Sequence, residues 1–362
     1  MRDDPAQWEV RVRTNRFALK LKPKEIWEFV SNLVDSDSHA RDIYGVRIAS
    51  DLDECQAIWQ AVIPGEHITD LWEVRSCFQQ HYKRPPNFIV VEDDEGICGL
   101  LPLSLIEELR CYGYFPGETW HGKTWLEQNR IYFRNGGPPA LLSRCNLPYH
   151  LNYLSVPDGQ INGSLVVDEI GYLFSPPHYD YDIKNYFEEF SHKSIKQILR
   201  EVAALEHRGA SYRLDNLADF DLMVQLNISR FGTNSYFHDR RFRESFRRLA
   251  HFLHDKGWLR FTTVLIGNEP AAVDMGCLYK GEYTLLAGGT SSRFPGIAKL
   301  INLHHMQRAC NERMQQVDFL CGDFNWKKLF HLSPRPLYML SNLPPEITQA
   351  AIPRTALHSV NV

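Results

Sequence analysis

The turn at residues 290–298 holds residues whose types and spacing predict anion binding. An apolar β-rich run leads into Arg293-x-x-Gly296-x-Ala298, and an amphipathic helical pattern follows. Gly296 has no side chain to keep an anion from the backbone, and the unpaired N–H groups at a helix start attract phosphate. Arg293 adds a donor that can bind phosphate in bidentate fashion. We predict that Arg293, Gly296, Ile297 and Ala298 bind a phosphate-bearing ligand; the alternative is an ordinary strand-to-helix turn.

Two aspartates and a lysine could supply acid–base chemistry near such a ligand. Asp274 interrupts an apolar strand pattern, where a carboxylate that faces a cleft suits a general base; the alternative is a strand face that meets water. Asp323 follows the strand expected at 316–321. It could take a proton from an amine or cap the short helix that follows. Lys327 could pair with Asp323 or reach a phosphate, or it could be a solvated helix lysine.

Other polar clusters are better explained by ordinary helix surfaces. His304 and His305 are adjacent on a predicted helix and point apart, so we expect no joint metal site. The five arginines within 239–248 alternate with apolar residues as in an amphipathic helix, although they could also meet phosphates. The basic residues within 193–200 form a similar solvated stripe.

The composition favours a cytoplasmic protein with one or two domains. The chain has 362 residues, 44% of them hydrophobic, and a net charge of −4, which gives no bulk attraction to nucleic acid or membranes. The N-terminus lacks an apolar signal core, and no run is long enough to span a bilayer. No two cysteines form a C-x-x-C pair, so we predict mostly buried free thiols. The eight cysteines are Cys55, Cys77, Cys98, Cys111, Cys145, Cys277, Cys310 and Cys321.

The chain divides into two halves with a similar order of elements. We predict an N-terminal extension at 1–43 with a helix at 24–34, a first unit at 44–180, a connecting helix at 181–209, a second unit at 210–345 and a tail at 346–362. In the first unit we expect a strand at 44–49, helices at 51–62 and 68–81, and a hairpin of 87–91 with 97–105. In the second unit we expect strands at 211–215, 259–266, 271–279, 283–290, 316–321 and 336–341, and helices at 219–228, 242–256, 297–314 and 324–330. The stretch 111–177 gives no firm pattern beyond short strands near 130–133 and 163–167.

This order of elements resembles the GNAT superfamily of N-acetyltransferases. Further motifs resemble the bacterial acetyltransferase-like family associated with cellulose biosynthesis proteins, which is related to the peptidoglycan aminoacyltransferases. The resemblance covers about residues 44–341, and it rests on Gly99-Leu-Leu-Pro-Leu, Leu205-Glu-x-x-Gly209, Pro295-Gly296 and Gly322-Asp323-x-x-Trp326-Lys327. The family usually has Tyr where this chain has Trp326. The first half also lacks a phosphate turn, since Arg134-Asn-Gly-Gly-Pro has Pro where a small residue should stand.

The resemblance implies an α+β protein of two tandem GNAT-like folds, with mixed central sheets flanked by helices. It implies acetyl-CoA or another acyl-CoA as co-substrate in the second unit and no metal. The donor thioester would enter between splayed strands, where Gly288 and Gly289 let its carbonyl approach backbone N–H groups; the alternative for this pair is a β-bulge.

The predicted function is acyl-CoA-dependent transfer to an amine of a small metabolite, sugar or amino acid. Asp323 or Asp274 would assist deprotonation of the amine. One alternative is an aminoacyltransferase that uses aminoacyl-tRNA, the only case in which nucleic acid would bind. Another is a binding protein that has lost turnover. A homodimer is compatible with the sequence.

Overall fold

The computed structural model describes residues 10–13, 18–21, 45–119, 124–134, 142, 144–156, 165–322 and 325–343. The predicted helix at 24–34, the tail at 346–362 and Asp323 lie outside the described residues. Within the predicted extension, β1 (Val10–Arg13) and β2 (Ala18–Leu21) form an antiparallel hairpin.

The first unit contains the strand, the helices and the hairpin predicted within residues 44–105, and further strands from residue 111 onward, where the sequence indicated only two short ones. They are β3 (Gly45–Ala49), α2 (Leu52–Val62), α3 (Trp72–Tyr82), β4 (Pro86–Asp93), β5 (Gly96–Ile106), β6 (Cys111–Tyr114), β7 (Tyr132–Phe133), β8 (His150–Leu154) and β9 (Val166–Phe174). The Asp51 carboxylate caps α2 by accepting from the N–H groups of Asp53 and Glu54, as its position before the helix predicts. The strands pair in the order β3-β4-β5-β6, with β7 beside β5, so the predicted hairpin of β4 and β5 is confirmed.

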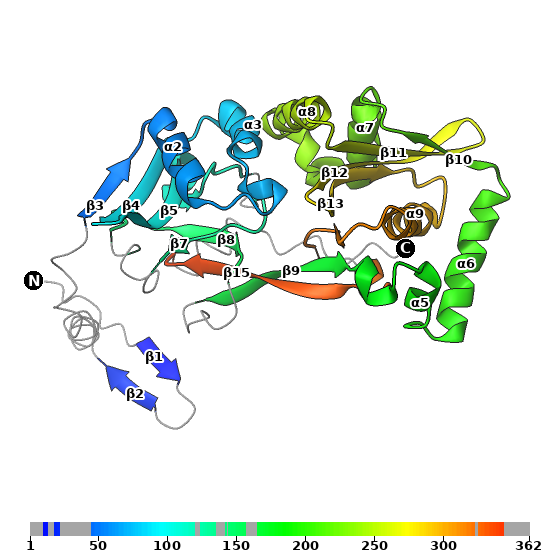
Figure 1. Ribbon diagram of the computed structural model, residues 1–362, viewed down its shortest axis with the longest axis horizontal. Coiled ribbons are helices and arrows are strands. Elements are labelled where there is room, and N and C mark those ends of the chain that lie inside the picture. Colours follow the sequence, from blue (N-terminus) through cyan, green and yellow to red (C-terminus); the bar gives the residue numbers. More distant parts are fainter. Residues whose placement is uncertain are drawn as a thin grey trace, which may run out of the picture.

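The second unit repeats this order of elements and extends it. Its elements are β10 (Ala210–Leu214), α7 (Asp219–Phe231), α8 (Arg240–Asp255), β11 (Leu259–Ile266), β12 (Glu269–Tyr279), β13 (Glu282–Thr290), α9 (Ile297–Asn311), β14 (Gln316–Asp318), α10 (Asn325–Leu329) and β15 (Ser333–Ser341). One strand and two helices precede three antiparallel strands in both units. The α+β class with a mixed sheet flanked by helices is confirmed: the eight-stranded sheet is mixed because β13 and β14 pair in parallel, and the strands of the five-stranded sheet pair antiparallel (Figure 1).

The predicted single helix at 181–209 is wrong. The segment forms two helices, α5 (Ile183–Phe187) and α6 (His192–Glu206). Ser191 separates them because its backbone is extended and its hydroxyl accepts from the N–H of Ser194, which starts α6. Gly209, with φ of +82°, lies just beyond the end of α6, as its sequence position predicts.

Each unit places its last strand in the sheet of the other. β9 belongs to the first unit but is antiparallel to β14, and β15 belongs to the second unit but is antiparallel to β8. β9 and β15 also pair with each other, so one eight-stranded sheet, β10-β11-β12-β13-β14-β9-β15-β8, crosses the boundary between the units. Figure 1 shows the two strands side by side beneath both units.

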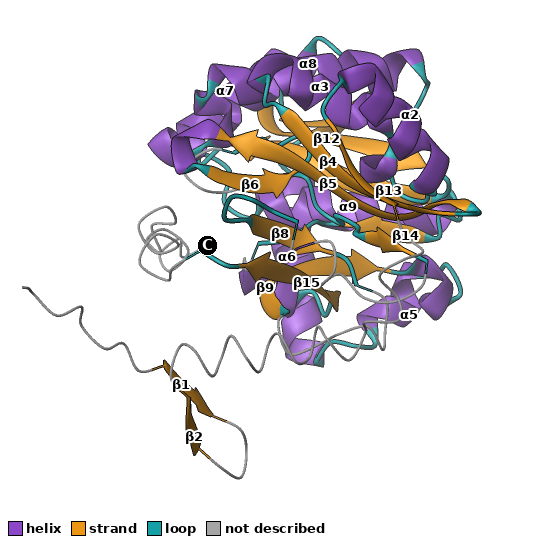
Figure 2. Ribbon diagram, turned by 90° about the vertical axis from the view of Figure 1, so that its left-hand side faces the viewer, coloured by secondary structure: helices purple, strands orange, loops and turns teal. Residues whose placement is uncertain are grey.

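The helices lie on opposite faces of the strands. α2, α3, α7 and α8 form one layer, and α9 lies on the other side of β12 and β13 (Figure 2). Helices α3 and α8 meet at the boundary between the two units, where aromatic rings pack edge-on and in a stack. Trp125 and Phe246 have ring centroids 4.6 Å apart, and Phe78 lies 5.8 Å from each of them. These aromatic contacts hold the two units against each other.

Candidate active site

The pairing of β13 with β14 ends partway along β13. The two strands are parallel from Glu282 opposite Gln316 to Thr284 opposite Asp318. β13 then continues to Thr290, while β14 ends at Asp318. The backbone of β13 beyond Thr284 therefore has no β14 partner, which is the arrangement expected for strands that admit a ligand between them.

A β-bulge lies within this unpaired part of β13. Met275 of β12 is opposite Ala287 and Gly276 is opposite Leu285, which leaves Leu286 as the extra residue. The β-bulge that the sequence analysis gave as the alternative for Gly288 and Gly289 therefore lies at Leu286 instead. A bulge turns backbone N–H groups out of the regular ladder, where a ligand can use them.

The predicted phosphate-binding residues meet in one turn at the start of α9. Gly296 is the N-cap of α9 with φ of +84°, a conformation that favours glycine. Arg293 is largely exposed, and its guanidinium lies 3.1 Å from the Glu269 carboxylate. The Ile297 side chain is buried in the core beneath the turn, so only its backbone can face a ligand. The Ile297 N–H already donates to Phe294 O at 3.1 Å.

A carboxylate from α6 lies beside this turn, which the sequence did not indicate. A Cβ built on Gly296 would lie 3.7 Å from Oε2 of Glu201. Lys299 donates to the same oxygen at 2.6 Å. The hydrogen bond from Lys299 lowers the pKa of Glu201. An anion bound in the turn would therefore compete with Glu201 for Lys299.

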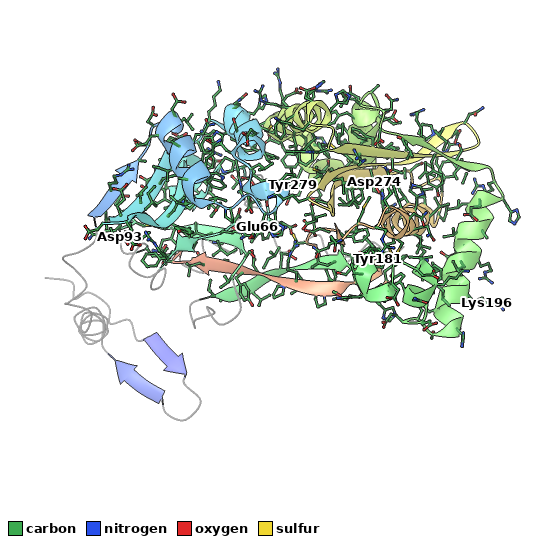
Figure 3. The ribbon with its side chains drawn as sticks, viewed as in Figure 1. Glu66, Asp93, Tyr181, Lys196, Asp274 and Tyr279 are labelled. Atoms are coloured by element: carbon green, nitrogen blue, oxygen red, sulfur yellow. The ribbon has the colours of Figure 1, made fainter. Side chains whose placement is uncertain are left out.

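Asp274 does not face water, contrary to the alternative considered from its strand pattern. The residue is 5% exposed and lies between β12 and α9 (Figure 3). Its carboxylate accepts from Nε2 of His305 at 3.0 Å. The other imidazole nitrogen, Nδ1, lies 3.3 Å from the Tyr283 hydroxyl. With Nε2–H donating to the carboxylate, Nδ1 of a neutral imidazole accepts from the tyrosine, so all three side chains are satisfied.

Gly288 and Gly289 serve close packing on opposite faces of β13. Gly288 is opposite Asp274 in the ladder, and a Cβ on Gly288 would lie 2.0 Å from Oδ1 of Asp274. A Cβ on Gly289 would lie 2.6 Å from the Met223 carbonyl oxygen of α7. The Gly288 carbonyl accepts from Nδ2 of Asn227 at 2.6 Å. The role predicted for these glycines in holding an acyl carbonyl stays a prediction.

Lys327 is buried, so the alternative of a solvated lysine is wrong. Its ammonium group donates to the carbonyl oxygens of Phe319, Leu320 and Cys321 at 2.8–2.9 Å. Burial lowers the pKa of Lys327. These contacts hold the chain that leaves β14, and a catalytic role for Lys327 stays a prediction that requires it to leave them. Asp323, outside the described residues, likewise stays a prediction.

A buried charged cluster that the sequence did not reveal lies where β14 ends. Arg335 of β15 donates to Asp318 at 2.7 Å and lies 3.3 Å from Glu127. Glu127 also accepts from the Cys321 N–H at 2.6 Å. Burial, followed by the negative charge of Asp318, raises the pKa of Glu127 to about 7. Glu127 comes from the stretch 111–177, whose lack of periodicity gave no signal.

The remaining predictions concern thiols, metals and membranes. All eight cysteines are free, and most are buried, as predicted. Among the described residues, no group of three or more His, Cys, Asp or Glu is arranged to hold a metal ion. None of the helices in the described parts of the chain is both long and apolar enough to cross a bilayer. The cytoplasmic location and the homodimer stay predictions.

Comparison with known proteins shows that part of the chain is similar to a recognised domain family. Residues 192–328, from α6 to α10, match the family model described as acetyltransferase (GNAT) domain. That span includes the phosphate turn, the bulged strand and Asp274. No curated protein matches the chain. The narrower resemblance to the family associated with cellulose biosynthesis stays a prediction.

Solved structures with a similar fold cover most of the chain. L-PGS from Bacillus licheniformis has 10% identity and a TM-score of 0.52, covering 83% of this chain and 96% of its own. FemX has 9% identity and a TM-score of 0.51, with 82% and 97% covered. A conserved protein of unknown function from Bacteroides thetaiotaomicron has 11% identity and a TM-score of 0.50, with 82% and 99% covered. Because these matches span both units at low identity, they establish the fold and nothing about the substrate.

Proposed function

We propose that this protein is an acyl-CoA-dependent N-acyltransferase whose second unit binds the acyl donor. The observation that carries this proposal is the course of β13. The strand separates from β14 after Thr284, has a β-bulge at Leu286 and leads into the turn at Gly296. The match of residues 192–328 to the acetyltransferase domain supports this reading. The bound acyl-CoA would supply the thioester that reacts.

The residues of the turn fit a pyrophosphate in type and conformation. Gly296 has no side chain of its own, and a Cβ there would make van der Waals contact with Glu201, whose Cβ and Oε2 would each lie 3.7 Å away. Arg293 and Lys299 are the cations beside the turn, and each now pairs with a carboxylate. A pyrophosphate would take over both pairs, because a phosphate oxygen is a strong acceptor for Arg and Lys.

The reaction needs a base for the amine and donors for the oxyanion. The amine nitrogen attacks the thioester carbonyl carbon, the C–S bond breaks, and the thiolate leaves and takes up a proton. Backbone N–H groups of β13 near the bulge would hold the oxyanion. Asp323 and Asp274 are the bases proposed from the sequence. Glu127 is a third, because its raised pKa near 7 suits proton transfer at neutral pH.

A second candidate is transfer from aminoacyl-tRNA, which requires no pyrophosphate in the turn. The observation in its favour is the carboxylate of Glu201 beside Gly296, which opposes an anion there. A protein that only binds ligands is the third reading, and turnover with any acceptor would exclude it.

The test is CoA and acetyl-CoA binding measured by calorimetry. The variant Gly296→Trp should abolish binding by filling the turn. Since any side chain at φ of +84° strains the backbone, Gly257→Trp is the matched control: Gly257 has φ of +71°, open space around it and a position between α8 and β11. Binding by wild type and Gly257→Trp but not by Gly296→Trp supports the proposal. Absence of binding by the folded wild type overturns it and favours an aminoacyl-tRNA donor, which RNA binding at varied salt would then test.

A further inference from the structure

The first unit contains its own cleft at the position that corresponds to the end of β13–β14 pairing. Tyr112 of β6 and Tyr149, the residue before β8, form an isolated parallel bridge, and β13 and β14 likewise pair in parallel. Beyond this bridge lies a cavity of about 20 Å³, which has room for a group the size of one water molecule. Its lining includes Asn129, His150 and Asn152.

Two buried polar atoms of the lining residues have no hydrogen-bond partner in the described part of the chain. They are Nε2 of His150 and Oδ1 of Asn129. The two residues are only 9% and 2% exposed. A buried polar atom without a partner costs about 1–3 kcal/mol, so native proteins rarely leave two beside one cavity unless something binds there.

The surrounding hydrogen bonds determine that both atoms are acceptors. Ser341 Oγ lies 3.2 Å from the Tyr149 carbonyl oxygen, to which it can only donate. It also lies 3.0 Å from Nδ1 of His150, and having donated its proton it must accept there. Nδ1 therefore carries the hydrogen. Burial lowers the pKa of His150, which keeps the ring neutral and leaves a lone pair on Nε2.

The orientation of the Asn129 side-chain amide is also set by its hydrogen bonds. Its Nδ2 donates to the carbonyl oxygens of Leu126 at 3.2 Å and Asn152 at 2.8 Å, so the amide cannot be flipped without losing both bonds. Its Oδ1 is therefore a true acceptor. Two residues that line the cavity thus carry acceptors without a donor, which a donating group bound there would satisfy.

A carboxylate next to the cavity adds negative charge. Nδ2 of Asn152 donates to Oδ2 of Asp168 at 2.9 Å, and Asp168 is close enough to act on the charge of His150. No cationic side chain of the described residues pairs with Asp168 within 4 Å. Burial raises the pKa of Asp168, so its charge is costly at this position. A cation in the cavity would stabilise the charged carboxylate, whereas a neutral water would satisfy only the two acceptors.

We propose that this cleft binds the primary ammonium group of a small ligand, with His150 and Asn129 as its acceptors. An ammonium head is the size of one water and carries three donors. The sequence predicts no phosphate turn in the first unit, so we expect its ligand to differ in kind from an acyl-CoA. This site does not depend on the function proposed for the second unit, so a failure of either proposal leaves the other unaffected.

The experiment follows the imidazole nitrogens of His150 by ¹⁵N NMR while methylammonium chloride is added to the whole protein. Tetramethylammonium is the control for charge without donors, and methanol is the control for a donor without charge. The resonance is assigned by its loss in His150→Phe. If that variant does not fold, Ser341→Ala identifies the same resonance, because it removes the acceptor for Nδ1–H. His251→Phe, on the exposed surface of α8, is the matched control.

The expected result is a neutral Nδ1–H tautomer whose Nε2 signal shifts saturably with methylammonium and with neither control. His150→Phe should weaken methylammonium binding about tenfold or more, because it removes an acceptor for a charged donor. An Nε2–H tautomer would overturn the proposal. So would the correct tautomer with no saturable shift, which would mean that the cavity holds an ordered water only.

Discussion

The Asp274 carboxylate and Nε2 of His305 are 3.0 Å apart, and both side chains are buried between β12 and α9. They come from positions 31 residues apart, and Gly288 provides the room in which they meet. The pair connects the middle of β12 to α9, the helix that begins after Gly296. It therefore links the packing of the second unit to the position of its proposed binding site.

The first prediction is that Gly288→Ala destabilises the protein through Asp274. The new methyl group would lie 2.0 Å from Oδ1, and His305 holds that carboxylate in place. We expect the free energy of unfolding to fall by about 1–3 kcal/mol in urea denaturation. Gly45→Ala is the control and should be nearly neutral, because a Cβ on Gly45 meets only Glu92 O at 3.9 Å. In an Asp274→Ala background the loss should shrink; an equal loss in both backgrounds would show that Asp274 is not the cause.

The second prediction concerns Glu127 and pH. Its folded-state pKa, about 7, lies above the ordinary value of 4.5, so the folded protein binds more protons than the unfolded chain between these values. Stability should therefore fall as pH rises from about 4.5 to about 7, by on the order of 1–3 kcal/mol for this group.

Glu127→Gln should remove that part of the pH dependence. The glutamine oxygen can still accept from the Cys321 N–H, and Arg335 keeps its contact with Asp318. Urea unfolding of wild type and variant at pH 5 and pH 8 measures the difference. We expect the variant to gain stability relative to wild type at the higher pH, and parallel curves would contradict the raised pKa.

The third prediction is that Glu201→Gln strengthens CoA binding. Removing the carboxylate charge frees Lys299 for a phosphate and lowers the repulsion at Gly296. Because the pair is partly exposed, we expect about a twofold to fivefold gain in affinity by calorimetry, and less at high salt. Glu206→Gln, an exposed residue at the end of α6, is the control and should have little effect. Weaker CoA binding by Glu201→Gln would mean that Glu201 helps to hold the donor.

The fourth prediction is that Lys327→Met is destabilising. The variant leaves the carbonyl oxygens of Phe319, Leu320 and Cys321 without their shared donor in a buried place. We expect a loss of at least about 2 kcal/mol in the free energy of unfolding. Lys328→Met, the exposed neighbour on α10, serves as control. Unchanged stability with lost transferase activity would instead favour the catalytic role predicted from the sequence.

The sequence by itself determined most of the local structure of the second unit. The span predicted for β11, 259–266, agrees with the structure, and α9 begins at Ile297 directly after Gly296 as the turn pattern requires. Strand alternation, helix periodicity and capping residues act over a few positions, so they can be read without knowing the fold. The helix predicted at 181–209 is interrupted because Ser191 caps a second helix, a local signal that the helical periodicity on either side of it conceals.

Only the tertiary structure decided which distant residues meet. The exchange of β9 and β15 between the units depends on sheet edges that periodicity does not label. Arg335 lies 3.3 Å from Glu127 across 208 positions of sequence, and His305 turns out to be the partner of Asp274. A carboxylate in an apolar strand indicates that a partner is needed, but not which one, because burial and pairing are set by the packing of whole elements rather than by neighbours in the chain.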